Sequence, residues 1–266
     1  MSRLDRRALF TSGAAAALLA AAGISAQAAP RAGGSLRIAV PRDGSLMALV
    51  KGAVLETFTE IAPDGTLRGQ LAQAWRASDR GRVWEFELSE GAVFHDGRQF
   101  DGLAARDALL EMGFGAVEPV GENGLRVLLP VEDADFPLRL AEPHMCVCQE
   151  AGSLVGTGPY RIKRLDAERG ALLEKVETHA APGWADRVEV TVIPDAGVRA
   201  EALLDGFVDI AYLPEPERLV QEAELKFHPS AKDIALAASD AVGMPRVIGA
   251  RGPLDDGRLA RRWWVV

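Results

Sequence analysis

Residues 71–98 read LAQAWRASDRGRVWEFELSEGAVFHDGR, and the middle of this stretch decides the fold class. Between residues 83 and 88, Trp84, Phe86 and Leu88 alternate strictly with residues that include two glutamates. Side chains of an extended chain alternate between two faces, so one face here is apolar and the other is charged. Polar turns containing glycine enclose the run on both sides. The pattern predicts a half-buried β-strand.

The same reasoning extends outward to most of the chain. Short alternating runs predict further strands, and an Asn-Gly pair at 123–124 predicts a tight hairpin. Helical segments are few and short, so the fold class is α+β, with mixed sheets and short helices. We expect strands at 35–40, 116–120, 125–129, 145–148, 161–165, 171–176, 187–193 and 206–211, helices at 45–58, 101–112 and 197–204, and a helical turn at 136–140.

Composition excludes several classes of protein. The chain has 266 residues, a formal charge of -8, and 48% hydrophobic and 26% charged residues, which are ordinary values for a globular protein. The acidic balance argues against a nucleic-acid partner, because binding nucleic acid requires a basic surface. The two cysteines are too few for a disulfide framework.

The first 28 residues are typical of a secretory signal peptide. A basic start is followed by an uncharged apolar run from Gly13 to Ile24 and by the small-x-small sequence Ala26-Gln27-Ala28. The pair Arg6-Arg7 favours the twin-arginine export route, with the Sec route as the alternative. We expect cleavage near Ala28 and a periplasmic mature protein.

Five short motifs occur in a fixed order along the mature chain, and together they resemble one family. They are Leu71-Ala72-Gln73-Ala74-Trp75, the run from Gly91 to Arg98, Gly156-Thr157-Gly158-Pro159-Tyr160, Gly206-Phe207-Val208-Asp209-Ile210, and Gly252-Pro253-Leu254-Asp255-Asp256. In this order they resemble the family 5 extracellular solute-binding proteins, which are the periplasmic receptors of ABC importers for peptides, nickel and related solutes.

The resemblance implies a fold and a domain plan. It implies the first lobe of a type II periplasmic-binding-protein-like fold, formed by residues 29–266. Within it, an inserted subdomain spans about 50–150, and the main subdomain combines 34–48 with 151–250. Family members are about twice as long, so this chain resembles a short form lacking the second lobe.

Other chemistry is less well supported by the residues. His144, Cys146 and Cys148 would point the same way on a strand and could hold a thiophilic metal, although two cysteines facing the core explain the pattern as well. His95-Asp96-Gly97 reads as a tight turn, since no G-x-S-x-G nucleophile motif accompanies it. We therefore expect no enzyme activity, no cofactor and no metal.

A ligand groove is expected by analogy with the family at the end of the first strand. The loop there contains charged and small residues with free backbone groups, and the segment after the 206–211 strand should lie beside it. The alternative is that both are ordinary surface loops. The expected ligand-binding residues are Arg42, Asp43, Ser45, Leu46, Tyr212, Leu213 and Pro214.

Two functions follow from these observations. The first is capture of a peptide or small solute for delivery to an ABC permease in the inner membrane, without catalysis. The second is a one-lobe interaction module without its own solute, because Trp263 and Trp264 offer large apolar surfaces for self-association. Packing of these tryptophans back onto the lobe is the alternative for that segment.

Overall fold

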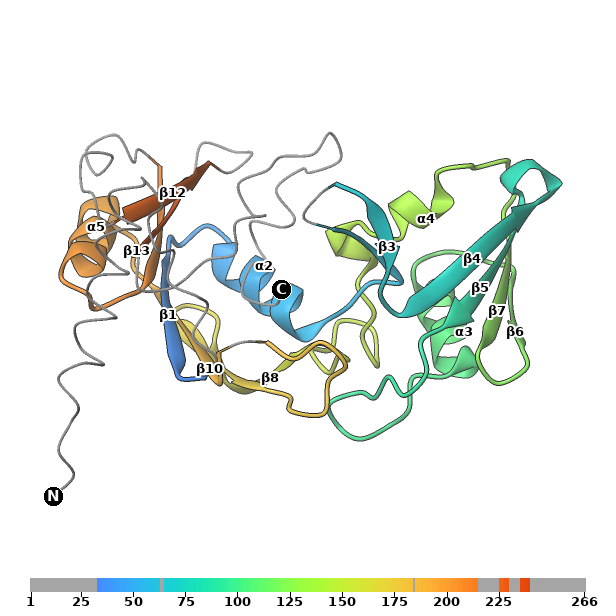
Figure 1. Ribbon diagram of the computed structural model, residues 1–266, viewed down its shortest axis with the longest axis horizontal. Coiled ribbons are helices and arrows are strands. Elements are labelled where there is room, and N and C mark those ends of the chain that lie inside the picture. The colour runs from blue at the N-terminus through green and yellow to red at the C-terminus, as the bar shows by residue number, and fades with distance from the viewer. Residues whose placement is uncertain (1–32, 63–64, 184, 215–224, 230–234, 240–266) are drawn as a thin grey trace, which may run out of the picture.

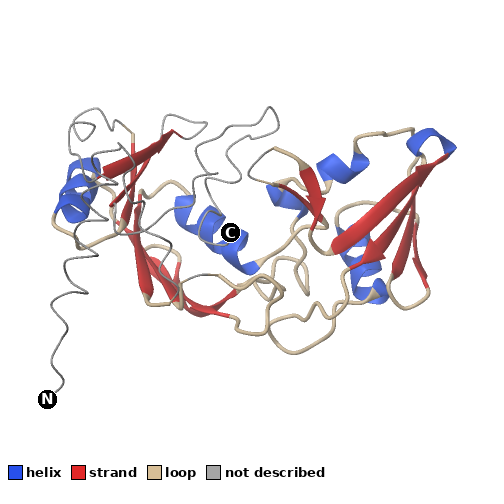
Figure 2. Ribbon diagram, in the orientation of Figure 1, coloured by secondary structure: helices blue, strands red, loops and turns tan. Residues whose placement is uncertain are grey.

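The computed structural model describes residues 33–62, 65–183, 185–214, 225–229 and 235–239. Helices in this part are short and strands predominate, which confirms the predicted α+β class (Figure 2). The strands are β1 (Ser35–Val40), β2 (Thr59–Ile61), β3 (Leu67–Gly69), β4 (Ala72–Ser78), β5 (Val83–Leu88), β6 (Val117–Val120), β7 (Gly124–Leu128), β8 (Tyr160–Asp166), β9 (Gly170–Lys175), β10 (Arg187–Val192), β11 (Ile210–Leu213), β12 (Leu225–Pro229) and β13 (Ala235–Ser239). The helices are α2 (Ser45–Val54), α3 (Gly102–Glu111), α4 (Phe136–Arg139) and α5 (Ala196–Leu204), with 3₁₀ turns at Asp79–Gly81 and Pro143–Met145.

The larger sheet has the strand order β12-β13-β11-β1-β10-β9-β8. Its central strand β1 pairs in parallel with β10 on one side and with β11 on the other. Ile38 and Val40 face a core built with α2, whereas Ala39 faces a second core built with α5. A strand buried on both faces needs apolar residues at successive positions, which explains the run IAV at its end.

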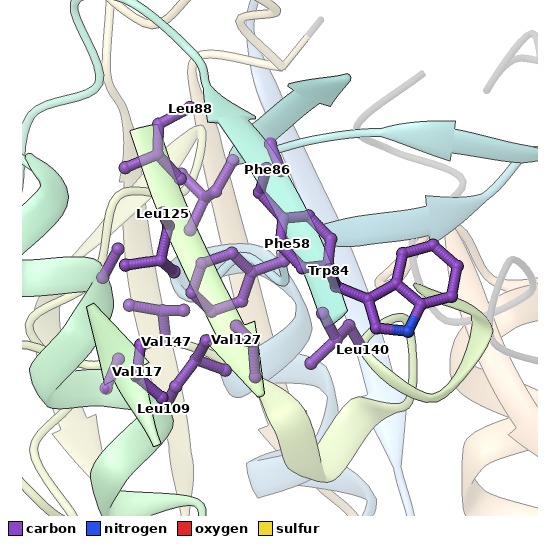
Figure 3. Packing of buried hydrophobic residues seen from close by; sticks show 14 of the residues in the cluster. Phe58, Trp84, Phe86, Leu88, Leu109, Val117, Leu125, Val127, Leu140 and Val147 are labelled. Atoms are coloured by element: carbon purple, nitrogen blue, oxygen red, sulfur yellow. The ribbon is translucent and has the colours of Figure 1, made fainter. Parts of the chain in front are cut away.

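The four-stranded sheet lies at the other end of the elongated molecule, in the order β4-β5-β7-β6 (Figure 1). The alternating run that opened the sequence analysis forms β5, and Trp84, Phe86 and Leu88 are buried as predicted. Their rings and side chains pack with residues from β7, α3 and α4 in one core (Figure 3). Phe58 and Val147, from the segments that join the two ends of the molecule, also belong to this core (Figure 3).

Three predicted elements differ from the structure. Helix α2 ends at Val54 rather than at residue 58, because Leu55 adopts an extended backbone with φ of -109° and ψ of 149°. The chain then runs through Thr57 and Phe58 toward the four-stranded sheet. The strand expected at 206–211 is instead β11, at 210–213. Residues 205–206 form a turn after α5, in which Gly206 has a φ of 71°, and the strand begins only at Ile210.

The strand expected at 145–148 is also wrong in its detail. Residues 143–145 form a 3₁₀ turn. After it, the chain makes only an isolated antiparallel β-bridge, between Glu56 and Val147. His144 therefore does not align with Cys146 and Cys148 on one strand face. Cys146 and Cys148 pack against the core of the larger sheet, as small apolar side chains do.

The Gly156–Tyr160 motif makes a close crossing between the two ends of the molecule. The Gly158 N–H donates to the Val54 carbonyl at the end of α2 with a donor–acceptor distance of 3.0 Å. A Cβ atom on Gly158 would lie 2.7 Å from the Val54 carbonyl oxygen and 2.8 Å from that of Ala53. The motif thus needs glycine for close backbone approach, and the Tyr160 ring that follows is fully buried.

Candidate functional site

The sequence-predicted ligand residues follow two neighbouring parallel strands. In the β1–β11 pair Ala39 lies opposite Ala211, so both strands end at the same edge of the larger sheet. The loop after β1 and Pro214, which follows β11, therefore lie at the same edge. In open sheets with parallel strands, ligands commonly bind outside such carboxyl ends, where the connections diverge to opposite faces. Here α2, which follows β1, and α5, which follows β10, cover opposite faces of the sheet.

The predicted residues divide into two groups at this edge. Leu46 and Leu213 are only 3% and 2% exposed, and they pack into the cores beneath α2 and α5. The remaining predicted residues are exposed or partly exposed: Arg42, Asp43, Ser45, Tyr212 and Pro214.

The charged groups of the β1 loop already have partners within the chain. The Asp43 Oδ1 atom accepts from the Ser45 N–H at 3.0 Å and from the Ser45 hydroxyl at 2.5 Å. The Arg42 Nε atom lies 3.7 Å from a Glu168 carboxylate oxygen. These bonds fix the loop at the start of α2, so the polar atoms that it offers a ligand are held in place.

Sequence reasoning missed Arg199 of α5, whose side chain bonds the backbone at this edge of the sheet. Its guanidinium is buried, with Nε donating to the Tyr212 carbonyl at 2.7 Å and Nη1 donating to the carbonyls of Ile193 and Pro194 at 2.5 and 2.8 Å. Burial lowers the pKa of Arg199, and the nearby Asp43 carboxylate opposes that shift. The sequence signal was an arginine four residues after the helix cap Asp195, and nothing local distinguishes it from a surface residue.

A cavity of about 630 Å³ lies further along α2. Its wall is built from separate segments: the later turns of α2, the β2–β3 hairpin, the turn at residues 89–93 and the loop at 176–181. Because Ala48 lines the cavity and lies one helical turn after Ser45, the cavity starts beside the predicted loop. None of the predicted ligand residues lines it, and no local sequence pattern could have assembled its wall.

Polar groups lie together where the cavity wall approaches the Gly156–Tyr160 crossing. Glu56 and His179 form a pair, with 3.1 Å between Oε1 and Nε2. Thr157 lines the cavity as well, and its buried hydroxyl has no hydrogen-bond partner among the described residues. On the rim, Arg68 Nε donates to Glu60 Oε1 at 2.8 Å.

His95 bonds the backbone of the crossing at residues 156 and 158. Its backbone N–H donates to the Gly156 carbonyl, and its Nε2 lies 2.8 Å from the Gly158 carbonyl oxygen. Burial lowers the pKa of His95 despite that hydrogen bond, so the imidazole is neutral at pH 7. Its neighbour Asp96 accepts from the Arg98 N–H, as expected of a tight turn.

Two classes of feature are missing from the part of the chain that the structure describes. No group of three or more His, Cys, Asp or Glu side chains there is arranged to hold a metal ion. The described helices also include none that is long and apolar enough to cross a membrane.

Comparisons with a family model and with curated proteins point to the same family. A model described as "Bacterial extracellular solute-binding proteins, family 5 Middle" matches residues 117–248, about half of the chain. The nickel-binding periplasmic protein of Escherichia coli (strain K12) is 23% identical over 190 residues, covering 60% of this chain and 36% of that protein. The probable D,D-dipeptide-binding periplasmic protein DdpA of the same organism is 26% identical over 175 residues, covering 54% and 34%.

A solved structure shows the same fold. The periplasmic binding protein DppA from Helicobacter pylori, in complex with the peptide STSA, superposes with a TM-score of 0.66 at 20% identity and covers 76% of this chain and 51% of its own. This chain spans about a third of the length of the curated relatives and about half of that structure. The ordered motifs, the sheet topology and these similarities agree: the chain belongs to the family 5 bacterial extracellular solute-binding proteins.

Proposed function

We propose that this chain is the solute-binding part of an ABC importer, which captures a peptide or related small solute in the periplasm and presents it to the permease. The cavity of about 630 Å³ carries the proposal, since it lies within the range of about 300–1,000 Å³ usual for small-molecule sites. A nickel-binding and a probable dipeptide-binding protein among the relatives support this class of solute.

The proposed ligand site extends along α2. Its deep part is the cavity, and its outer end is the sheet edge with Arg42, Asp43, Ser45, Tyr212 and Pro214. The ten residues of α2 span about 15 Å, which an extended peptide of about four or five residues could bridge. Leu46 and Leu213 would support the site from the core rather than contact the solute.

Binding without catalysis is the function that the side chains favour. The His95 imidazole is bonded to a backbone carbonyl, and Asp43 is bonded to Ser45. Both groups therefore position the chain rather than activate a nucleophile. The two curated relatives are likewise named as periplasmic binding proteins.

The proposal is tested on protein purified from its native periplasm. Native mass spectrometry should detect a retained solute, and a thermal-shift screen of dipeptides, amines, sugars and metal chelates should identify a class that raises the unfolding temperature. Substituting Gly52→Leu would place a large side chain in the cavity wall on α2 and should abolish the shift. A protein that retains no solute and responds to none of these classes would exclude the proposal.

Export itself stays a prediction, because residues 1–28 lie outside the described residues. We propose the twin-arginine route with cleavage near Ala28. Changing Arg6 and Arg7 together to lysine should block export by that route while leaving Sec export intact. N-terminal sequencing of the periplasmic protein would locate the cleavage site.

A second candidate function is an interaction module, and one observation favours it. Val198, Leu204 and Phe207 are 50%, 49% and 69% exposed around α5, at the end of the molecule far from the four-stranded sheet (Figure 1). Such apolar groups are common at protein contacts. Light scattering of the wild type and of Phe207→Ser would test this function, and a monomer at all concentrations would argue against self-association. Trp263 and Trp264, the other proposed contact, lie outside the described residues.

A further inference from the structure

Glu56 is a buried carboxylate in the wall of the cavity. The residue is 7% exposed, and its position is fixed because its backbone carbonyl accepts from the Val147 N–H at 2.7 Å. One carboxylate oxygen, Oε1, faces His179 Nε2 at 3.1 Å. Burying a carboxylate is energetically unfavourable unless a cation balances its charge. The protonation state of His179 therefore decides whether the Glu56–His179 pair is neutral or negatively charged.

The hydrogen bonds around His179 determine that state. The backbone N–H of Ala181 donates to His179 Nδ1 with a distance of 3.0 Å. A backbone N–H can only donate, so Nδ1 carries no proton. The single ring proton is then on Nε2, which donates it to Glu56 Oε1. His179 is therefore neutral, and the pair carries the full negative charge of Glu56.

Nearby cations do not neutralise this charge. Among the described residues no ion pair joins Lys51 or Arg68 to Glu56, and Arg68 bonds Glu60 instead. His95 is neutral because burial lowers its pKa, and Arg161 beside it lies 3.8 Å from Glu174. The described lining residues include three glutamates, at 56, 60 and 90, against Lys51 and Arg68, which leaves the wall acidic overall.

The second carboxylate oxygen points to a ligand. Glu56 lines the cavity, and its Oε2 atom accepts no hydrogen bond from any described residue. We propose that Glu56 binds the protonated amine of a small solute through Oε2, with His179 holding the carboxylate in place through Oε1. This rests on the proposed function and names the chemical class of its solute.

An ammonium group suits this wall better than a metal ion. A divalent cation needs several protein ligands, and the described residues provide no cluster of three. The Nε2 of His179 is also unavailable to a metal, because it carries a proton directed at Glu56. An ammonium donates its own hydrogen bonds and needs only acceptors, and a charge-assisted bond to a desolvated carboxylate is strong.

The test uses two probes of equal length, 1,4-diaminobutane and 1,4-butanediol, which differ in charge but not in chain. Isothermal titration of the wild type should give at least tenfold tighter binding of the diamine, which corresponds to about 1.4 kcal/mol. Glu56→Gln keeps an acceptor for His179 but removes the charge, and it should erase that preference. The matched control Glu118→Gln removes an exposed carboxylate outside the cavity and should change the diamine affinity less than threefold.

The outcomes separate this inference from the function on which it rests. Equal affinity for the two probes, or a diamine preference that survives Glu56→Gln, would overturn the amine site. Stabilisation by uncharged or anionic solutes alone would reject the amine site and leave the solute-binding function standing. A complete lack of binding by any solute class would reject both. The comparison of probes on the wild type remains decisive even if Glu56→Gln fails to fold.

Discussion

Gly158→Ala is the most direct test of how the two ends of the molecule are joined. The added Cβ would lie 2.7 Å from both the carbonyl carbon and oxygen of Val54 and 2.8 Å from the oxygen of Ala53. All three atoms are backbone atoms of the last turn of α2, so no side chain can rotate away. To relieve these contacts, the backbone at Gly158 and the end of α2 must separate by several tenths of an ångström.

The cost has two parts. Overpacking against a fixed backbone costs about 1–3 kcal/mol. Separation also weakens the 3.0 Å hydrogen bond from the Gly158 N–H to the Val54 carbonyl, which contributes about 0.5–1.5 kcal/mol. The free energy of unfolding should therefore fall by about 2–4 kcal/mol. For a chain of this size, that lowers the melting temperature by about 4–16 °C.

The matched control is Gly115→Ala. A Cβ on Gly115 would meet no atom within 4 Å, and its φ is compatible with alanine. Such a change should leave stability unchanged or raise it by about 0.4–1 kcal/mol. Urea unfolding followed by circular dichroism measures both variants. A Gly158→Ala protein as stable as the wild type, or a Gly115→Ala protein destabilised to the same degree, would refute the account of the crossing.

Three further substitutions test single contacts by urea unfolding. Asp101→Ala removes the acceptor of the Leu103 and Ala104 N–H groups at the start of α3 and should cost about 1 kcal/mol, whereas Asp101→Asn should cost less. Because the pKa of His95 is lowered in the folded protein, the unfolded chain binds a proton on this imidazole more readily. The free energy of unfolding should therefore fall as the pH drops below about 6.5, and it should fall less steeply in His95→Gln. Identical pH dependence in the two proteins would contradict this. Arg199→Met removes the guanidinium that donates to the carbonyls of Ile193, Pro194 and Tyr212, and it should cost at least about 3 kcal/mol. A loss below about 1 kcal/mol would show that the guanidinium is not needed at the sheet edge.

Strands were the most predictable feature of this chain. Residues 83–88 and 35–40 are strands with the predicted bounds. In residues 83–88 the burial of one face appears in the sequence as an apolar residue at every second position. The end of α2 was not predictable in the same way. Leu55 and Phe58 continue an apolar pattern that suits a helix, but Leu55 packs in one core and Phe58 in the other. Only a chain that leaves the helix can serve both.

The candidate site was predictable only in part, for a related reason. The sheet edge could be foreseen because β1 and β11 are local signals and the family resemblance places them side by side. No local sequence pattern indicates the residues of the cavity wall. Glu56 and His179 are 123 residues apart, and neither lies in a motif that marks it as polar and buried. Their pairing depends on the crossing at Gly158, which the sequence shows as a glycine motif without naming its partner.

The crossing and the cavity wall are parts of one structure. The segment from Val54 to Phe58 accepts the hydrogen bond of Gly158, bonds Val147 through Glu56, and contributes Glu56 to the cavity. A buried carboxylate beside a neutral histidine weakens this junction, since its charge is removed from water without a full counter-ion. A bound ammonium would supply that counter-ion. Solute binding should therefore stabilise the segment that joins the two ends of the molecule, and the gain in stability should grow with solute concentration as RT ln(1 + [L]/Kd).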